Sequence, residues 1–237
     1  MVDGKMPMGR YVKRFAIASF MCALPAVVPA IEVLDTFETG NPNQWGWTNI
    51  NGSFYTLQPT GGNPDGWLDS GTPYFTDHPN LTSIPPPGSE LRRALDSGVL
   101  IRASYDFQRL DPGCFPQDNT ASTFALELID LHSDPGGAVI TAHVNGHRSP
   151  TGPSGWKTVS FTIPSDSTSL PSGWLLDAPA ELNYTWPDLM HNIDGISFLS
   201  VSPDDVTFSG CWRLGADNVS VTYGESIFAN GFESTSP

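Results

Sequence analysis

Turn-forming residues interrupt this sequence so often that long helices have little room between them. The 237 residues include 23 glycines and 22 prolines, the two residue types that most strongly break helices and mark turns. The segments between them are short and rich in β-branched and aromatic side chains, and few of them show the 3.6-residue period of a helix. This pattern predicts many short strands and therefore an all-β protein.

The clearest candidate strands alternate apolar and polar residues, which is typical of a strand buried on one face. In residues 101–107 the polar side chains of Arg102, Ser104 and Asp106 separate apolar ones. Strands are expected at 31–35, 52–57, 66–69, 98–110, 122–131, 138–144, 156–163, 193–201 and 213–223. Their spacing and alternation predict a single two-sheet antiparallel β-sandwich. Asn145-Gly146 predicts a tight hairpin turn, and residues 182–190 a short helical turn.

The first thirty residues have the organisation of a secretory signal peptide. Basic residues precede a short apolar run that starts at Phe15 and ends in Val28-Pro29-Ala30, as signal peptides do. A membrane anchor is the alternative, but the run of about 14 residues is shorter than the roughly 20 that span a bilayer. We therefore predict a signal peptide (1–30), a β-sandwich domain (31–223) and a C-terminal tail (224–237), in a secreted or periplasmic protein.

The exported part is strongly acidic. It keeps seven basic residues against 24 acidic ones, a formal charge of −17. Such a charge repels phosphate backbones and anionic lipids, so neither nucleic acid nor a membrane is an expected partner. The two cysteines that remain, Cys114 and Cys211, are expected to form a disulfide in an oxidising compartment. Two unrelated buried thiols are the alternative.

Three motifs follow one another in an order seen in a known family. They are Asp35-Thr-Phe-Glu-Thr-Gly-Asn, Gly61-Gly-Asn-Pro-Asp-Gly-Trp-Leu and Leu214-Gly-Ala-Asp-Asn-Val-Ser-Val. Together they resemble the laminin IV type A (laminin B) domain and its bacterial relatives over about residues 34–221, with Asp65 where that pattern usually has glycine. The family belongs to the galactose-binding-like jelly-roll group, which includes many carbohydrate-binding modules. The resemblance implies a jelly roll whose first and last strands are neighbours.

The same resemblance implies a structural calcium site between those two strands. The positions that match the family's ligands are Glu38 and Asp217, with a backbone carbonyl from Gly40 or Asn41. Carboxylate and carbonyl oxygens are the ligands that Ca²⁺ takes in proteins. The alternative is that Glu38 is merely solvated and that Asp217 caps a turn.

Seven tryptophans in the chain raise the possibility of sugar binding, because an exposed indole can stack on a pyranose ring. Trp174 and Trp186 lie in loop-like segments and are the candidates for stacking. Asp177, Asn183 and Tyr184 are near them in sequence and could bind sugar hydroxyls. Packing in the core is the alternative for most of the tryptophans.

Catalytic signals are weak in this sequence. Glycoside hydrolysis needs two carboxylates about 5–10 Å apart, but the three-residue offset of Glu127 and Asp130 along a strand points them to opposite faces. His143 and His147 are expected on the surface of the predicted hairpin. We therefore predict a secreted, non-catalytic binding or adhesion module for a glycan or an extracellular surface protein. A sandwich glycosidase or lyase and a purely structural exported protein are the alternatives.

Overall fold

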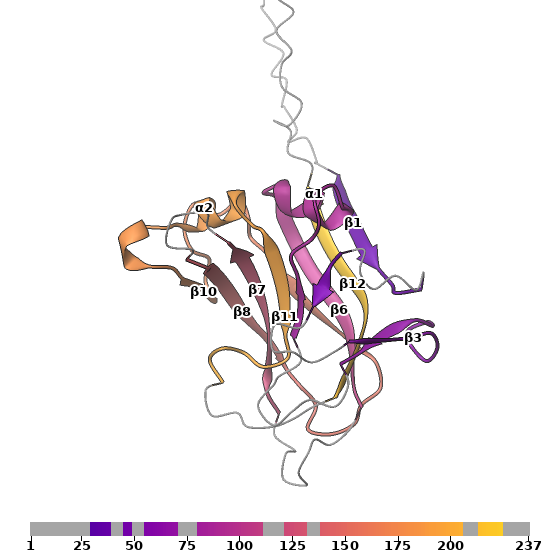
Figure 1. Cartoon of the computed structure of the whole chain (residues 1–237). Coiled ribbons are helices and arrows are strands. Elements are labelled where there is room, and N and C mark those ends of the chain that lie inside the picture. Colours follow the sequence, from indigo (N-terminus) through magenta and orange to yellow (C-terminus); the bar gives the residue numbers. More distant parts are fainter. Residues whose placement is uncertain are drawn as a thin grey trace, which may run out of the picture.

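The computed structural model describes residues 29–38, 45–48, 55–70, 80–110, 121–131, 138–205 and 213–224. Over these residues the chain forms two antiparallel sheets that pack face to face (Figure 1). The predicted all-β, two-sheet antiparallel sandwich is therefore confirmed. Nearly all of the predicted signal peptide and tail, and both Cys114 and Cys211, lie outside the described residues.

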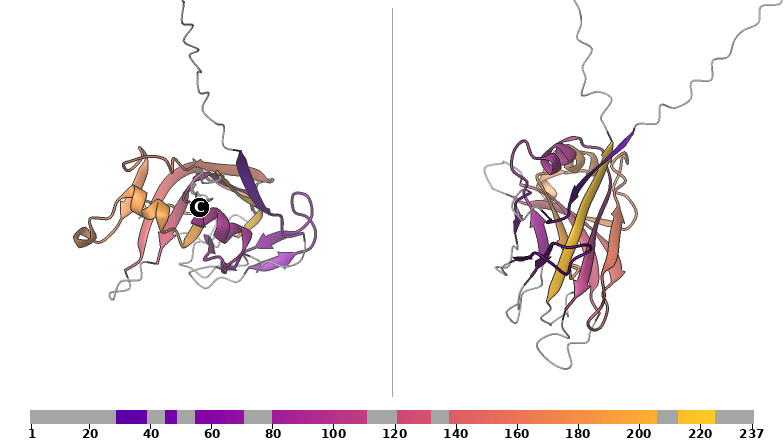
Figure 2. Two further views of the ribbon diagram at one scale, coloured as in Figure 1. Left: turned by 90° about the horizontal axis from the view of Figure 1, so that it is seen from above. Right: turned by 90° about the vertical axis from the view of Figure 1, so that its right-hand side faces the viewer.

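The first sheet has the strand order β3-β4-β12-β6-β9, and β1 also pairs with β12. Its strands are β1 (Ala30–Asp35), β3 (Thr56–Gln58), β4 (Trp67–Asp69), β6 (Leu100–Arg109), β9 (Lys157–Thr162) and β12 (Leu214–Gly224). β1 pairs with β12 over its whole length, from Ala30 opposite Gly224 to Asp35 opposite Val219 (Figure 2). The opening and closing strands are thus neighbours, as the family resemblance implies.

The second sheet has the strand order β10-β8-β7-β11-β5-β2. Its strands are β2 (Trp47–Thr48), β5 (Asn80–Ser83), β7 (Thr123–Asp130), β8 (Ile140–Arg148), β10 (Trp174–Asp177) and β11 (Gly195–Leu199). Three of them, β2, β5 and β10, were not predicted. Each has at most four residues, too few for alternation to show in the sequence, and each lies at or near an edge of the sheet.

Aromatic side chains from both sheets meet in the core. Tyr105 and Phe107 of β6 point inward from the first sheet, and Phe124 of β7 and Phe198 of β11 from the second. The ring centroids are 4.9 Å apart for Tyr105 and Phe198 and 4.5 Å apart for Phe107 and Phe124. All four rings are at most 4% exposed. Pairs at this distance contribute beyond the area that they bury, so these contacts help to hold the sheets together.

β6 is more deeply buried than its alternation predicts. Ser104 and Asp106 are on the face away from the core, yet both are buried. The Ser104 hydroxyl forms a hydrogen bond of 2.9 Å with that of Ser220 on β12, and Asp106 accepts a hydrogen bond from the Asn63 side-chain amide. Neighbouring strands and the loop that contains Asn63 therefore exclude water from the outer face at this point.

The predicted hairpin at Asn145-Gly146 is wrong, because β8 continues through these residues to Arg148. The register between β7 and β8 shifts near this point, between Thr123 and Ala125. A Cβ atom on Gly146 would lie 2.5 Å from Cε1 of Phe161. The glycine therefore serves close packing against β9 and does not form a turn.

Two short α-helices lie at one end of the sandwich (Figure 1). α1 (Glu90–Asp96) begins after Ser89, whose hydroxyl accepts the Arg92 backbone N–H, and it buries Leu91, Ala94 and Leu95. α2 (Trp186–His191) follows the 3-10 turn η1 (Ala180–Leu182) and starts in a capping box, close to the helical turn predicted at 182–190. Within the described residues no helix is long and apolar enough to cross a membrane.

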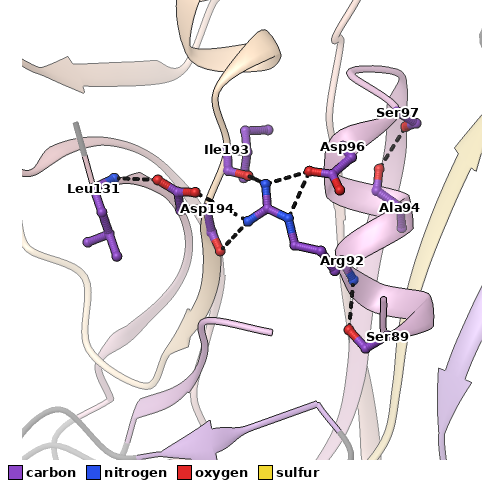
Figure 3. Close-up of polar contacts among 8 residues, drawn as sticks. All are labelled: Ser89, Arg92, Ala94, Asp96, Ser97, Leu131, Ile193 and Asp194. Atoms are coloured by element: carbon purple, nitrogen blue, oxygen red, sulfur yellow. Dashed lines mark hydrogen bonds and ion pairs between the residues drawn. The ribbon is translucent and has the colours of Figure 1, made fainter. Parts of the chain in front are cut away.

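Arg92 ties α1 to the second sheet (Figure 3). Its guanidinium donates to the backbone carbonyls of Ile193 and Asp194 and to the Asp194 carboxylate, at 3.1–3.3 Å. Nε also donates to Asp96 at 2.7 Å, and this hydrogen bond raises the pKa of Arg92 above its ordinary value. Asp194 accepts the Leu131 N–H through its other oxygen, so the network joins α1, β7 and the residues before β11.

Candidate functional site

Glu38 and Asp217 both bind the loop 60–66, which lies outside the first sheet. The Asp65 backbone N–H donates to Oε1 of Glu38 at 3.2 Å, and the Asn63 backbone N–H donates to Oδ2 of Asp217 at 2.6 Å. Glu38 and Asp217, the two acids of the predicted calcium site, therefore accept hydrogen bonds from backbone N–H groups that are two residues apart in the same loop. Gly40, the third predicted ligand, lies outside the described residues.

Glycines let the loop 60–66 approach the sheet closely. A Cβ on Gly62 would lie 2.6 Å from the Gly66 carbonyl oxygen and 2.8 Å from Oδ2 of Asp217. A Cβ on Gly66 would lie 2.6 Å from the Phe37 carbonyl oxygen. These positions exclude any larger residue without a backbone shift, which explains the glycine-rich motif between β3 and β4.

The carboxylates beneath the loop are close enough to repel one another. Oδ2 of Asp106 accepts from the side-chain amides of Asn63 and Asn218 at 3.0 and 2.9 Å. Burial raises the pKa of Asp217 to about 6, against the hydrogen bonds from the Asn63 and Asn218 N–H groups, and the charges of Asp106 and Glu38 raise it further. The site therefore carries negative charge that its amide donors only partly offset.

These residues offer calcium some, but not all, of the ligands that it takes. Carboxylates and nearby backbone carbonyls have the hard oxygens that Ca²⁺ prefers, and the crowded charge at Asp217 favours a cation. Within the described part of the chain, however, no group of three or more His, Cys, Asp or Glu side chains is arranged to hold a metal ion. A calcium ion here would depend on backbone carbonyls for the rest of its ligands.

The structure corrects the prediction that Trp174 and Trp186 form an exposed stacking surface. They are 4% and 1% exposed, and their ring centroids are 4.8 Å apart. The Trp186 indole N–H donates to the Pro164 carbonyl at 3.1 Å. Because β10 and α2 turn both rings inward, the two indoles do not form an exposed stacking surface.

The three polar residues predicted beside these tryptophans do not gather at one site. Asp177 is exposed at the end of β10, opposite Thr141. Asn183 is exposed and follows η1 with a φ of 47°. The Tyr184 hydroxyl donates to the buried carboxylate of Asp130, and burial together with this bond raises the pKa of Tyr184 above its ordinary value. Tyr184 therefore has a structural role.

The structure reveals a groove of about 440 Å³ where β8 and β10 of the second sheet meet β9 of the first. Sequence reasoning missed it, because its residues come from three strands and the loops between them. Its polar lining consists of Asn145, His147, Ser160, Thr162 and Ser172, and its apolar lining includes Phe161, Pro164 and Trp174. The lining thus combines side chains that can form hydrogen bonds with apolar ones, two of which are aromatic.

The free edge of β9 adds backbone groups to this groove. Within the described residues β9 pairs only with β6, and the Ile163 N–H donates to the Ile101 carbonyl at 2.9 Å. Bonded and non-bonded pairs alternate along an antiparallel ladder. Ser160 and Thr162 therefore direct their backbone N–H and C=O groups away from β6 and toward the groove.

A second polar cluster lies on the outer face of the second sheet, next to the groove. His143 is opposite Glu127 in the register of β7 and β8, and its Nε2 lies 3.4 Å from Oδ2 of Asp204. Burial raises the pKa of Glu127, and the charge of His143 partly opposes this shift. Hydrogen bonds from Asn145 and His143 lower the pKa of Asp204. Asp204 also holds Asn145, a groove residue, at 2.8 Å.

Comparison with known proteins adds little to this geometry. No protein-family profile and no curated protein sequence matches the chain. A similar solved structure is that of the N-terminal CBM22-1–GH10 modules of the Clostridium thermocellum endo-1,4-β-D-xylanase 10B complexed with xylohexaose, at 15% identity and a TM-score of 0.46. The likeness covers 80% of this chain and 28% of that one. This likeness assigns no functional residue to the chain. The resemblance to the laminin IV domain stays a prediction.

Proposed function

We propose that this protein is an exported, non-catalytic module that binds a glycan in the groove between β8, β9 and β10. The lining of the groove carries this proposal. Sugars present hydroxyl groups at their edges and C–H groups on their faces, so they suit a site with many hydrogen-bonding groups and an apolar floor. The groove has five polar side chains, the edge of β9 and an apolar lining that includes the partly exposed Val144 and Pro164.

The groove favours binding over hydrolysis. A glycosidase needs two facing carboxylates about 5–10 Å apart, and the described residues that line the groove include neither Asp nor Glu. Glu127 lies outside the groove beside His143, and Asp130 is bonded to Tyr184. The carboxylates of β7 therefore face different surroundings.

Replacing Ser160 with tyrosine should abolish glycan binding. Ser160 is exposed on β9 and lines the groove, so a phenol ring would fill the space that the ligand needs, while tyrosine suits an edge strand. Retardation of the full chain in gels that contain soluble xylan, β-glucan, galactomannan or polygalacturonate would measure binding. We expect the unaltered chain to be retarded by at least one polysaccharide and Ser160→Tyr by none.

Ser169→Tyr is the matched control, because Ser169 is exposed in the loop after β9 and does not line the groove. It should be retarded like the unaltered chain. Equal retardation of Ser160→Tyr and Ser169→Tyr would place binding elsewhere. An unaltered chain that migrates freely in every gel, and on a wider glycan array, would leave the structural role as the better account.

We also propose that calcium stabilises the sandwich at Glu38 and Asp217. The observation that supports it is the crowded charge of Glu38, Asp106 and Asp217 under the loop 60–66. When bound, calcium would supply positive charge to this cluster. A ligand that binds only the folded state stabilises it by about 2.7 kcal/mol at a hundredfold excess over Kd. We therefore expect the melting temperature to rise by several degrees between 1 mM EDTA and millimolar calcium.

Glu38→Gln separates this effect from general ionic effects. Glu38 is exposed, and glutamine still accepts the hydrogen bond from Asp65, so the variant should melt close to the unaltered chain in EDTA. It should gain little from calcium. Magnesium at equal concentration controls for screening, and identical melting curves of the unaltered chain in EDTA and calcium would disprove this proposal.

A further inference from the structure

The outward side chains of β9 continue from the groove toward a pair of tryptophans. Thr158, Ser160 and Thr162 alternate along the strand and are exposed, and Trp156 precedes them on the same face, partly exposed. At about 3.3 Å per residue, the distance from Trp156 to Thr162 is roughly 20 Å. Ser160 and Thr162 line the groove. The groove therefore lies at one end of this row of outward side chains, and the Trp156 indole lies at the other end.

Trp156 is fixed in place by its contacts. Its ring centroid lies 5.9 Å from that of Trp67, with an interplanar angle of 77°. The indole N–H groups of Trp67 and Trp156 donate to the carbonyls of Thr60 and Gly61 at 3.0 and 3.2 Å. Both rings also rest on Gly215, where a Cβ would lie 2.9 Å from Trp67 and 3.1 Å from Trp156.

This arrangement leaves a rigid, partly exposed aromatic surface at the start of β9. Both indole donors are already used, so the rings can offer a ligand only their apolar surface. Such a surface suits the C–H face of a sugar ring, and its rigidity lowers the entropy cost of binding.

Charge near the row disfavours an anionic ligand. Glu38 and Asp65 are exposed on and beside the loop that the two tryptophans hold, and the chain has a formal net charge of −14. Among the described residues, two exposed basic side chains lie near the row: Arg102, opposite Thr162, and Lys157, which follows Trp156 on β9. An uncharged chain would bind along the row without this repulsion.

We infer that the ligand is a linear, uncharged polysaccharide that lies along β9, with one end in the groove and a later sugar ring against Trp156. This inference rests on the proposed function and adds the length, charge and path of the glycan. It implies that affinity grows with chain length until the ligand reaches Trp156.

Titration calorimetry with xylan, β-glucan and mannan oligosaccharides of two, four and six units tests this inference on the full chain. We expect Trp156→Ala to weaken binding of the six-unit ligand roughly tenfold and binding of the two-unit ligand less than twofold. Trp156→Phe keeps an aromatic surface and tests the same point if the alanine variant folds poorly. Its loss should be smaller and likewise confined to long ligands. Leu34→Ala, an exposed apolar residue on β1, is the control and should change neither affinity.

Each outcome separates the inference from the proposed function. Equal losses for two-unit and six-unit ligands would show that Trp156 only supports the fold, and no loss would show that the ligand does not reach it. Both results overturn the inference and leave groove binding intact. Preference for polygalacturonate over the uncharged chains would also overturn it. An unaltered chain that binds no glycan at all would remove the proposed function and this inference together.

Discussion

Replacing Gly66 with alanine should destabilise the domain strongly, although the substitution adds only one methyl group. The added Cβ would lie 2.6 Å from the carbonyl oxygen and 2.9 Å from the carbonyl carbon of Phe37, and both are backbone atoms that cannot rotate away. Overpacking of this kind costs about 3 kcal/mol. For a domain of this size we expect the melting temperature to fall by roughly 10 °C, measured by circular dichroism.

Gly155→Ala is the control for this variant. Gly155 immediately precedes Trp156, and nothing lies within 4 Å of the Cβ that alanine would add there. Its cost should stay within about 0.5 kcal/mol. If Gly66→Ala has the same melting temperature as Gly155→Ala, the close approach of the loop 60–66 to Phe37, just after β1, is not a feature of the folded protein.

Replacing Arg92 with alanine should cost about 2–3 kcal/mol of folding stability. The guanidinium is the shared donor to Asp96, Asp194 and the Ile193 carbonyl, and its side chain is only 22% exposed. Hydrogen bonds to charged groups contribute about 1.5–3 kcal/mol, and removing the donor leaves acceptors unsatisfied. Urea denaturation measures the free energy of unfolding.

Arg93 provides a matched control on the same helix. Its side chain is 66% exposed and lies 3.8 Å from Glu90, and exposed pairs of this kind contribute little. Arg93→Ala should therefore cost less than about 0.5 kcal/mol. The cost of Arg92→Lys should lie between those of Arg92→Ala and Arg93→Ala, because lysine keeps the positive charge but lacks the planar guanidinium with its several donors. Equal costs at positions 92 and 93 would show that the contacts in Figure 3 do not anchor α1.

The strands that the sequence predicted well are those with a long apolar face. β6, β7, β9 and β12 each place alternate side chains in the core, so the hydrophobic pattern alone locates them within a few residues. β2, β5 and β10 have two to four residues and exist because a longer neighbour pairs with them. α1 has a readable start at Ser89 and apolar residues at Leu91, Ala94 and Leu95, but its length of seven residues gives the helical period little room to repeat.

The sequence was a weaker guide to the candidate sites. The resemblance carried by the motifs around Glu38 and Asp217 indicated which two segments meet: one motif starts at the end of β1 and the other lies in β12, its partner strand. Trp174 and Trp186 were misplaced, because loop-like composition does not reveal that β10 and α2 bury both indoles. The groove was missed, since Asn145 and Ser160 become neighbours only when two sheets pack. A site of this kind leaves no local pattern for a sequence to show.

The pairing of β1 with β12 has an architectural consequence. Ala30 lies directly opposite Gly224, so the two strands that bound the sandwich enter and leave it at one point. A compact domain whose two ends lie close together can be inserted into a loop of a host protein. It can also be circularly permuted, so that its termini lie elsewhere. The groove is built from β8, β9 and β10, none of which pairs with β1 or β12, so grafting the unit at this junction would leave every groove strand uncut.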